Sequence, residues 1–272
     1  MRAEVQAKFE PFWRALSAAP QAALMLDYDG TLAPFQIKRE KAFPYPGVAL
    51  ILQRIMSDAR TRVVVISGRN ANELIPLLNI EPRPEIWGVH GLQRMRVDGT
   101  IEAAHLDPRT VKALSDAEKW LNYQQLLHVA ELKPGGIAVH WRGLGELVVE
   151  DLRSRVLLGW RLIAAESGLK LQEFDGGIEI LAPEAVKGTA VRAVLGEIGP
   201  HAAVAYLGDD NTDESAFRAI GERGISVLVR PQRRRTAAKF WLKPPDEVVD
   251  FLELWLKHCG ETAVRKGAAK TV

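Results

Sequence analysis

The chain is poor in cysteine and in net charge, and both shortages limit what it can be. Cys259 is the only cysteine among 272 residues, so no disulfide can form within the chain. Basic residues exceed acidic ones by only two, which leaves a formal net charge of +2 at pH 7. This small excess lacks the electrostatic signature of a nucleic-acid-binding protein. The three arginines at 233–235 are typical of a solvated loop, and we expect no nucleic-acid partner.

Long apolar runs are also missing. A membrane-spanning helix needs about 18 or more consecutive apolar residues, and no such stretch is present. The first 21 residues carry Glu4, Lys8, Glu10 and Arg14 where a signal peptide would have an apolar core. We therefore expect no membrane association and a cytoplasmic location. The hydrophobic and charged fractions, 47% and 26%, are typical of a globular protein with one large domain or two small ones.

Strand and helix patterns alternate at both ends of the chain. Buried strands are predicted at residues 24–27, 62–66, 85–89, 203–207 and 225–229. Helices are predicted at residues 3–18, 46–60, 71–78, 187–198, 212–220 and 246–257. Such alternation is typical of a parallel sheet with helices on both faces. Residues 260–272 are small or charged, and we expect them to fray.

The middle of the chain has a different pattern. Asp98 and Gly99 separate two short strand-like runs, which predicts a hairpin. Helices are then predicted at 108–129 and 146–167, and strands at 136–141, 169–174 and 178–181. We therefore predict an α/β fold whose core is a doubly wound, Rossmann-like parallel sheet formed by residues 1–105 and 182–272. An α+β cap domain at residues 106–181 would be inserted into it.

Two carboxylates follow the first apolar run. Asp27 and Asp29 come directly after residues 22–26 and are followed by Gly30 and Thr31. They would lie on the same side of an extended chain, because side chains alternate with period two. Carboxylates held so close repel each other unless a cation or a proton joins them. The pattern indicates a metal site, an acid/base pair, or both, and the alternative is a surface turn.

A second acidic cluster follows the strand at 203–207. It contains Asp209, Asp210 and Asp213, and in a parallel sheet it would lie at the same edge as the first cluster. Carboxylate oxygens without histidine or cysteine favour a hard cation such as Mg²⁺. The alternative is a helix N-terminus, where acidic residues are common; it accounts for Asp213 and Glu214 better than for Asp209.

Two isolated residues complete the candidate site. Ser67 follows a buried strand, where its hydroxyl and the next amides could hold a phosphate oxygen. Lys187 opens a helix, where a cation is electrostatically misplaced unless an anion lies nearby. Each has a simpler explanation alone: Ser67 as a helix cap and Lys187 as a solvated side chain.

Together these four pieces resemble the motifs of the haloacid dehalogenase (HAD) superfamily of phosphotransferases. The resemblance implies that Asp27 is a nucleophile that forms an aspartyl-phosphate and that Asp29 is the general acid and base. It implies that Asp27, Asp29 (through its main-chain carbonyl) and Asp209 hold Mg²⁺. Ser67 and Lys187 would neutralise the phosphoryl oxygens.

Further segments resemble the trehalose-6-phosphate phosphatases of this superfamily, over residues 22–256. They are Leu-Asp-Tyr-Asp-Gly-Thr-Leu, Ile-Ser-Gly-Arg, Gly-Val-His-Gly (88–91), Ala-Val-His-Trp-Arg (138–142) and Gly-Asp-Asp-Asn-Thr-Asp-Glu. The resemblance implies a cap of the class called C2, a sugar-phosphate substrate, trehalose biosynthesis, and functional pairing with a trehalose-6-phosphate synthase. The expected substrate-binding residues are Gly30, Arg69, His90, Gly91, Lys133, His140, Arg142 and Glu179, with Asp210 and Asp213 in supporting places.

Several alternatives remain open. His140 and Arg142 alternate onto one face of a predicted strand, which fits a hydroxyl-rich ligand or an outward polar face. Gln93 stands where the family often has glutamate, so mannosyl- or glucosyl-3-phosphoglycerate is a rival substrate. A non-catalytic regulatory homologue is disfavoured, because Asp27, Asp29, Lys187 and Asp209 are all present.

Overall fold

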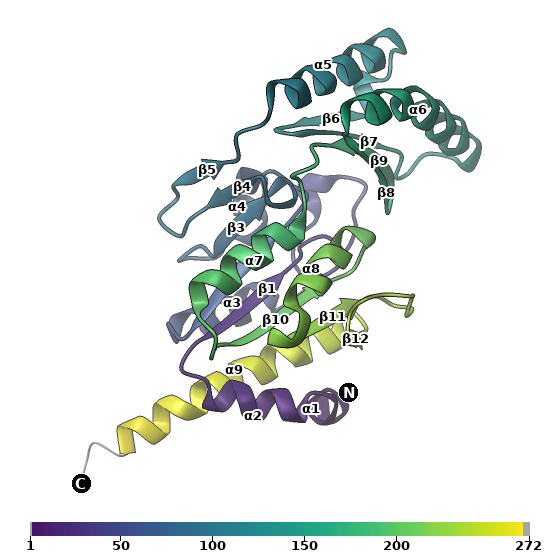
Figure 1. Cartoon of the computed structure of the whole chain (residues 1–272). Helices are drawn as coiled ribbons and strands as arrows, with labels where there is room; N and C mark the ends of the chain where they lie inside the picture. The colour runs from purple at the N-terminus through teal and green to yellow at the C-terminus, as the bar shows by residue number, and fades with distance from the viewer. Residues whose placement is uncertain (1, 269–272) are drawn as a thin grey trace.

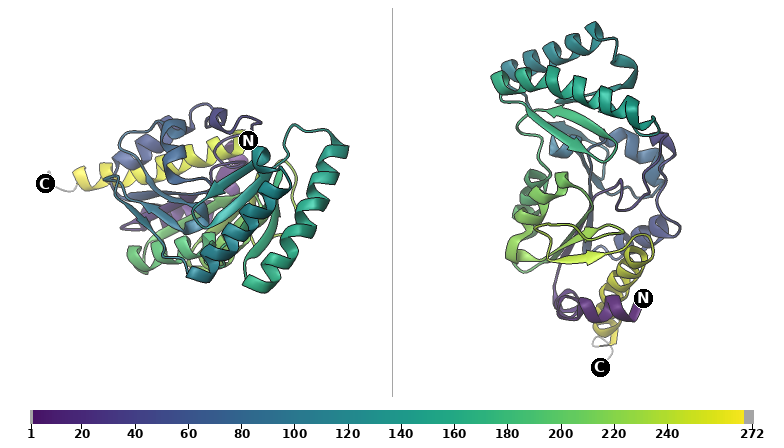
Figure 2. Two further views of the ribbon diagram at one scale, coloured as in Figure 1. Left: turned by 90° about the horizontal axis from the view of Figure 1, so that it is seen from above. Right: turned by 90° about the vertical axis from the view of Figure 1, so that its right-hand side faces the viewer.

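The computed structural model describes the backbone of residues 2–268 and the side chains of residues 2–259 (Figure 1). Within these residues the strands form an eight-stranded sheet and a separate four-stranded sheet. The larger sheet has the order β12-β11-β10-β1-β2-β3-β4-β5, and the smaller has the order β6-β7-β9-β8. The smaller sheet and its two helices sit above one end of the larger layer (Figures 1 and 2).

The larger sheet is parallel except at one edge. Its parallel strands are β12 (Phe240–Leu242), β11 (Ile225–Val229), β10 (Ala203–Gly208), β1 (Ala22–Leu26), β2 (Thr61–Ile66) and β3 (Glu85–Gly88). The hairpin of β4 (Gln93–Met95) and β5 (Ile101–Ala103) adds an antiparallel edge. Because β1 lies between β2 and β10, the segments that follow these three strands meet at one edge of the sheet.

Helices cover both faces of this sheet. One face packs against α1 (Arg2–Lys8), α2 (Glu10–Ala18), α3 (Val48–Ser57), α4 (Ala71–Leu78) and α9 (Asp246–Ala268), and the other against α7 (Lys187–Ile198) and α8 (Glu214–Ile220). Strand β1 is buried on both sides: Leu24 and Leu26 join the first cluster, and Ala23 and Met25 join the second. Burial on both faces explains why the parallel strands read as continuous apolar runs, and the predicted doubly wound fold is confirmed.

The smaller sheet, called the cap sheet below, is antiparallel and has its own apolar core; with its two helices it forms the cap. Its strands are β6 (Ala130–Lys133), β7 (Gly136–His140), β8 (Lys170–Phe174) and β9 (Gly177–Leu181), and α5 (Pro108–Tyr123) and α6 (Glu146–Ser167) cover its outer face (Figure 1). Val139 and Ile178 pack against these helices. The residues that alternate with them on β7 and β9 therefore point to the other side of this sheet, toward the domain that contains the parallel sheet.

Some sequence expectations differ from the structure. The helix predicted at 3–18 is broken at Phe9, because Pro11 lies in the first turn of α2 and has no N–H to continue a helix. The helix predicted at 108–129 ends at Tyr123, and neither β6 nor β12 was predicted. The fraying expected at 260–272 is wrong as far as Ala268, where α9 ends, and residues 269–272 lie outside the described part.

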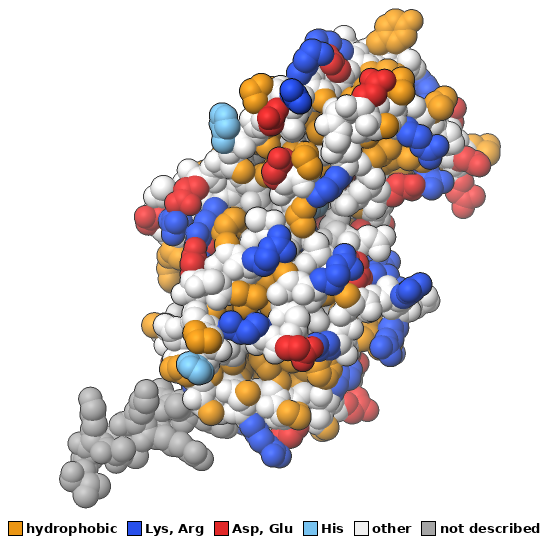
Figure 3. Space-filling model, viewed as in Figure 1, with side chains coloured by type: hydrophobic (Ala, Val, Ile, Leu, Met, Phe, Trp, Pro, Cys, Tyr) orange, Lys and Arg blue, Asp and Glu red, His pale blue; other side chains and the backbone are white. Residues whose placement is uncertain are grey.

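Charge on the surface is mixed. On the face seen in Figure 3, acidic and basic side chains are interspersed over both the core and the cap sheet's helices, in keeping with the small net charge. Among the described helices, none combines the length and apolarity needed to cross a membrane.

Candidate active site

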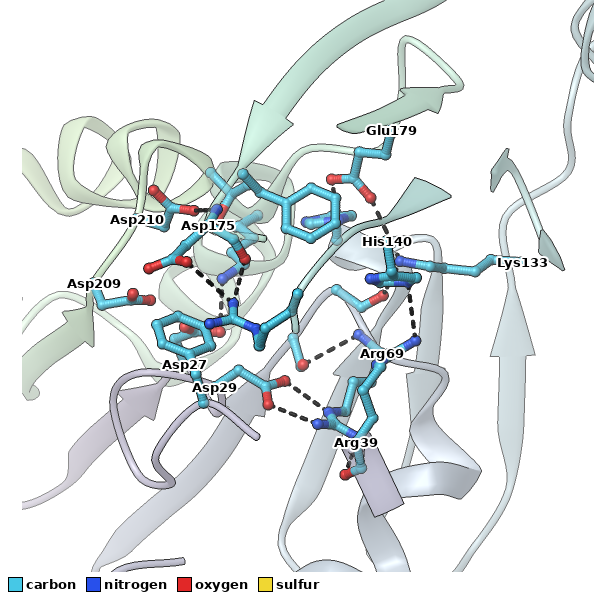
Figure 4. A pocket seen from close by; sticks show the side chains of 18 of the residues that line it. Asp27, Asp29, Arg39, Arg69, Lys133, His140, Asp175, Glu179, Asp209 and Asp210 are labelled. Carbon is cyan, nitrogen blue, oxygen red and sulfur yellow. Dashed lines mark hydrogen bonds and ion pairs between the residues drawn. The ribbon is translucent and has the colours of Figure 1, made fainter. Parts of the chain in front are cut away.

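A cavity of about 120 Å³ lies between the carboxyl edge of the parallel sheet and the open face of the cap sheet (Figure 4). Both parts of the chain line it. From the core come Asp27, Asp29, Ser67, Arg69, His90, Lys187, Asp209 and Asp210, and from the cap come Lys133, His140, Arg142 and Glu179. Residues far apart in the sequence therefore share one cavity.

Lys187 and Asp27 form a buried ion pair at the floor of this cavity. The Lys187 ammonium donates to Asp27 Oδ1 at 2.6 Å and to Asp213 Oδ1 at 2.8 Å, and its side chain is 3% exposed. Burial alone would lower the pKa of Lys187, but Asp213 and Asp27 outweigh it and hold this pKa above its ordinary value. The lysine is a buried cation, which rules out the solvated side chain.

Three carboxylates converge beside this lysine. Asp27, Asp209 and Asp213 each offer one oxygen, and these atoms lie within 4.8 Å of one another. Burial raises the pKa of Asp27 to about 7, against the effect of Lys187 and with that of Asp213. Burial and then Asp27 also raise the pKa of Asp209. One ammonium cannot balance three carboxylates, so this oxygen-only cluster fits a hard divalent cation.

Asp213 has a larger role than the helix-capping alternative gave it. Its side chain is fully buried and accepts hydrogen bonds from the backbone N–H groups of Asp209 and Asp210, at 3.0 and 2.9 Å. It also accepts from the Tyr206 hydroxyl at 2.5 Å. Asp213 therefore holds the loop after β10 and orients Lys187. Glu214 does not join it, and pairs with Arg234 at 2.5 Å.

Asp29 lies beside the triad but pairs elsewhere. Arg69 donates to both carboxylate oxygens, at 2.6 and 2.7 Å, and Arg69 is 3% exposed (Figure 4). Strand β1 ends at Leu26, and both Asp27 and Asp29 line the cavity beyond it, but their carboxylates pair with different cations. The bidentate pair fixes where the Asp29 carboxylate points.

Ser67 and His90 also line the cavity. The Ser67 hydroxyl oxygen accepts the Arg69 N–H at 3.1 Å, whereas α4 is capped by Asn70, so Ser67 is not its helix cap. His90 Nε2 lies 2.9 Å from Glu179 Oε1 on the cap strand β9. This contact joins core to cap directly above the cavity.

The cap contributes a set of ionised side chains. His140 Nε2 lies 2.8 Å from Glu131 Oε2, and Lys133 contacts Glu179 at 3.4 Å and the Gly68 carbonyl at 3.2 Å. Burial opposes ionisation of Glu131, but His140 and Lys133 outweigh it and lower its pKa to about 2. His90 and Lys133 likewise hold the pKa of Glu179 below its usual range, against burial. Both carboxylates are therefore charged acceptors.

Sequence reasoning missed Glu131, and it misjudged Arg142. Glu131 lies on β6, the strand that was not predicted, although the spacing of Glu131 and Lys133 matches one face of a strand. Strand β7 ends at His140, so Arg142 is not on that strand with it. Arg142 follows in a turn and lies 4.3 Å above the Phe35 ring.

Three residues of the sequence motifs, Gly30, Gly91 and Gln93, pack beside the site but do not line the cavity. A Cβ at Gly30 would lie 2.4 Å from Asp209 Oδ2, so only glycine allows this close approach. Gly91 lies against Val186 and Ala190 at the start of α7. Gln93 accepts the Ala71 N–H at 3.3 Å, which gives this departure from the family pattern a structural place at the beginning of α4.

Comparisons with known proteins agree with this site. A family model described as trehalose-phosphatase matches residues 25–246. A trehalose-phosphate phosphatase of Mycobacterium tuberculosis (strain H37Rv) is 31% identical over 263 residues, which cover 91% of this chain. The chain spans only 64% of the length of that relative.

Solved structures show the same fold. The C-terminal domain of C. albicans trehalose-6-phosphate phosphatase has a TM-score of 0.78 at 20% identity, covering 91% of this chain and 96% of that one. A haloacid dehalogenase-like hydrolase from Bacteroides thetaiotaomicron has a TM-score of 0.62 at 16% identity, covering 86% and 98%. The predicted HAD-type fold and the resemblance are thus confirmed, and the chain belongs to the trehalose-phosphatase family.

Proposed function

We propose that the protein is a Mg²⁺-dependent phosphatase that hydrolyses trehalose 6-phosphate to trehalose and inorganic phosphate. The observation that carries this proposal is the buried Asp27–Lys187 pair, at 2.6 Å, under a roof of charged cap side chains. The Asp27–Lys187 pair suits a phosphoryl group, and the charged cap side chains suit a ligand rich in hydroxyls. The name of the Mycobacterium tuberculosis relative supports this substrate.

In the first half of the reaction, one carboxylate oxygen of Asp27 attacks phosphorus and the bond to the sugar oxygen breaks. Asp29 gives its proton to that leaving oxygen, so the sugar departs as an alcohol. The Ser67 hydroxyl and the Lys187 ammonium bind the phosphoryl oxygens and balance their charge. Before it can act as the acid, Asp29 must leave its bidentate pair with Arg69, at 2.6 and 2.7 Å, and take up a proton.

In the second half, Asp29 takes a proton from water, and the water oxygen attacks phosphorus of the aspartyl-phosphate. The bond to Asp27 breaks and inorganic phosphate leaves. Asp27, Asp209 and the main-chain carbonyl of Asp29 would hold Mg²⁺, with Asp213 and Asp210 supporting them. Bound there, Mg²⁺ would neutralise charge on the phosphoryl oxygens. Mg²⁺ is favoured because it accepts all-oxygen sites and shares substrate phosphate oxygens.

We propose that residues 106–181 form the domain that selects the substrate. His90, Lys133, His140, Arg142 and Glu179 would contact the sugar, because polar groups of this kind reject analogues that lack matching hydroxyls. Arg69 would act through Asp29, and the glycines at 30 and 91 through the close packing they permit. The trehalose 6-phosphate would be supplied by a trehalose-6-phosphate synthase, with which the enzyme would be functionally paired.

A panel of sugar phosphates, assayed for phosphate release with Mg²⁺, tests the proposal. Trehalose 6-phosphate should be hydrolysed with a higher kcat/KM than glucose 6-phosphate or the mannosyl- and glucosyl-3-phosphoglycerates. A preference for a phosphoglycerate would move the assignment to the rival substrate. Binding of trehalose 6-phosphate with no turnover of any ester would instead indicate a regulatory homologue.

A further inference from the structure

The segment at residues 35–39 connects the first acidic motif to α3 and runs beneath the cap. Three of its residues, Phe35, Ile37 and Arg39, contact the cap, although Ile37 is itself largely exposed. The chain bends at residues 37 and 38 and enters a 3-10 helix, Arg39–Lys41. None of these three residues has a part in the chemistry described above.

Each contact of this strip is of a different kind. The Phe35 ring lies 4.3 Å from the guanidinium of Arg142, a distance suited to a cation–π interaction. A Cβ at Gly143 would lie 3.1 to 3.3 Å from three side-chain carbons of Ile37, so the Ile37 side chain packs onto the turn of the cap that follows β7. Arg39 forms an ion pair with Glu131 and lies 3.4 Å from His140 Nε2.

The strip is anchored on the catalytic side as well. The Arg39 carbonyl accepts a hydrogen bond from Arg69 at 3.0 Å, and Arg69 holds Asp29. The Phe35 ring also approaches Gly30, where a Cβ would lie 2.8 Å from it. A displacement of the strip would therefore change contacts both at the acid motif and at the cap residues Arg142, Glu131 and His140.

The size of the cavity requires the cap to move. Its volume is about 120 Å³, whereas sites for drug-sized ligands typically have about 300–1,000 Å³. Asp27, Ser67, Lys187 and Glu179 line this cavity and are each less than 5% exposed, so it has too little room beside them for a whole disaccharide phosphate in this position of the cap. The contacts of the strip must break and form again in each turnover.

We infer that Phe35, Ile37 and Arg39 are positioning residues: a docking strip on the core that sets the closed position of the cap and aligns Arg142, His140 and Glu131 over the phosphoryl site. The inference rests on the proposed function, because the aligned cap side chains act only on the sugar part of the substrate. Ile37, although 70% exposed, is then a contact that is released when the cap opens.

A reversible cross-link tests the inference. In the double variant Ile37→Cys with Gly143→Cys, the Cβ atoms would lie in the range of about 3.5–4.5 Å that disulfides need. The native Cys259 is buried, with its thiol 3.1 Å from the Thr61 hydroxyl, so it is a poor competitor for disulfide formation. Oxidation with diamide should form the disulfide and lower kcat/KM for both trehalose 6-phosphate and p-nitrophenyl phosphate by at least about tenfold, because the cap can no longer open.

Reduction with dithiothreitol should restore the activity of the same protein, which controls for the strain of a cysteine at Gly143, whose φ is +86°. Wild type treated in the same way should not change. Free thiols after oxidation would show that the contact is absent in solution. A disulfide without loss of activity would show that the strip does not have to open. Either result overturns the inference.

A second pair of variants separates positioning from general stability. Ile37→Ser should lower kcat/KM for trehalose 6-phosphate several-fold more than for p-nitrophenyl phosphate, whose hydrolysis needs no alignment of sugar contacts. Leu50→Ser, at a 61% exposed leucine on α3, is the matched control and should change neither. Equal losses for both substrates would refute the positioning role. If trehalose 6-phosphate is no substrate even for wild type, the proposed function fails, while the cross-link is still judged on p-nitrophenyl phosphate.

Discussion

Binding of Mg²⁺ should release protons from the acidic triad in slightly acidic solution. Burial raises the pKa of Asp27 to about 7, and Asp209 is shifted in the same direction. A cation stabilises the charged form of a carboxylate, so a bound Mg²⁺ would bring these pKa values down again. The proton and the metal therefore compete for the same oxygens.

The magnitude follows from the pKa of Asp27. A carboxyl group with a pKa of about 7 is about nine-tenths protonated at pH 6, so each Mg²⁺ bound there should displace about one proton. Below pH 7 the apparent Kd should rise by about tenfold for each pH unit, which is about 1.4 kcal/mol. The number of protons released should fall as the pH is raised through 7.

Calorimetric titration with MgCl₂ measures this number when it is repeated in buffers of different ionisation enthalpy. Asp29→Asn is the control, because the Asp29 carboxylate pairs with Arg69 outside the triad and should not supply the proton. Binding at pH 6 without proton release would refute the reasoning about Asp27. Loss of proton release in Asp29→Asn would show that the proton comes from Asp29 and not from Asp27.

Three further outcomes are expected. Asp27→Asn should fold, as judged by circular dichroism, but lose all but a trace of phosphatase activity, since an amide cannot attack phosphorus; substantial residual turnover would exclude Asp27 as the nucleophile. EDTA should abolish activity and Mg²⁺ should restore it, and full activity of exhaustively chelated protein would exclude a metal requirement. Arg142→Ala or Glu179→Ala should lower kcat/KM for trehalose 6-phosphate by about tenfold or more and for p-nitrophenyl phosphate little, because in the proposed function these side chains would contact only the non-reacting part of the substrate; equal losses would show that they do not select the sugar.

The parallel core was largely predictable because its signals are local. Strand β2 and helices α4 and α7 contain the period and the end signals of their structures, and each lies within a residue or two of its prediction. Strands β6 and β12 were missed because they are short and follow other patterns closely. Their place is decided by pairing with distant strands, such as β6 with β7 and β12 with β11, which no local window contains.

The candidate site was predictable where residues follow strands, and not where side chains choose partners. The topology of a parallel sheet already brought Asp27, Ser67 and Asp209 to one edge. The sequence did not indicate that Asp213 would bind Lys187, or that Asp29 would turn to Arg69, because each depends on side-chain direction after the strand ends. The docking of residues 35–39 on the cap likewise depends on two segments about a hundred residues apart.

Strand β1, with a neighbour on each side, has a consequence for how the molecule tolerates change. Amides in the middle of a sheet exchange with solvent only in the rarest openings, so residues 22–26 should be among the slowest to exchange in the chain. Asp27 follows this protected strand, while the cap side chains that line the cavity belong to a separate sheet with its own apolar core. If the proposed function holds, substitutions that reshape the cap can therefore change which phosphate ester is accepted without disturbing the strand that precedes Asp27.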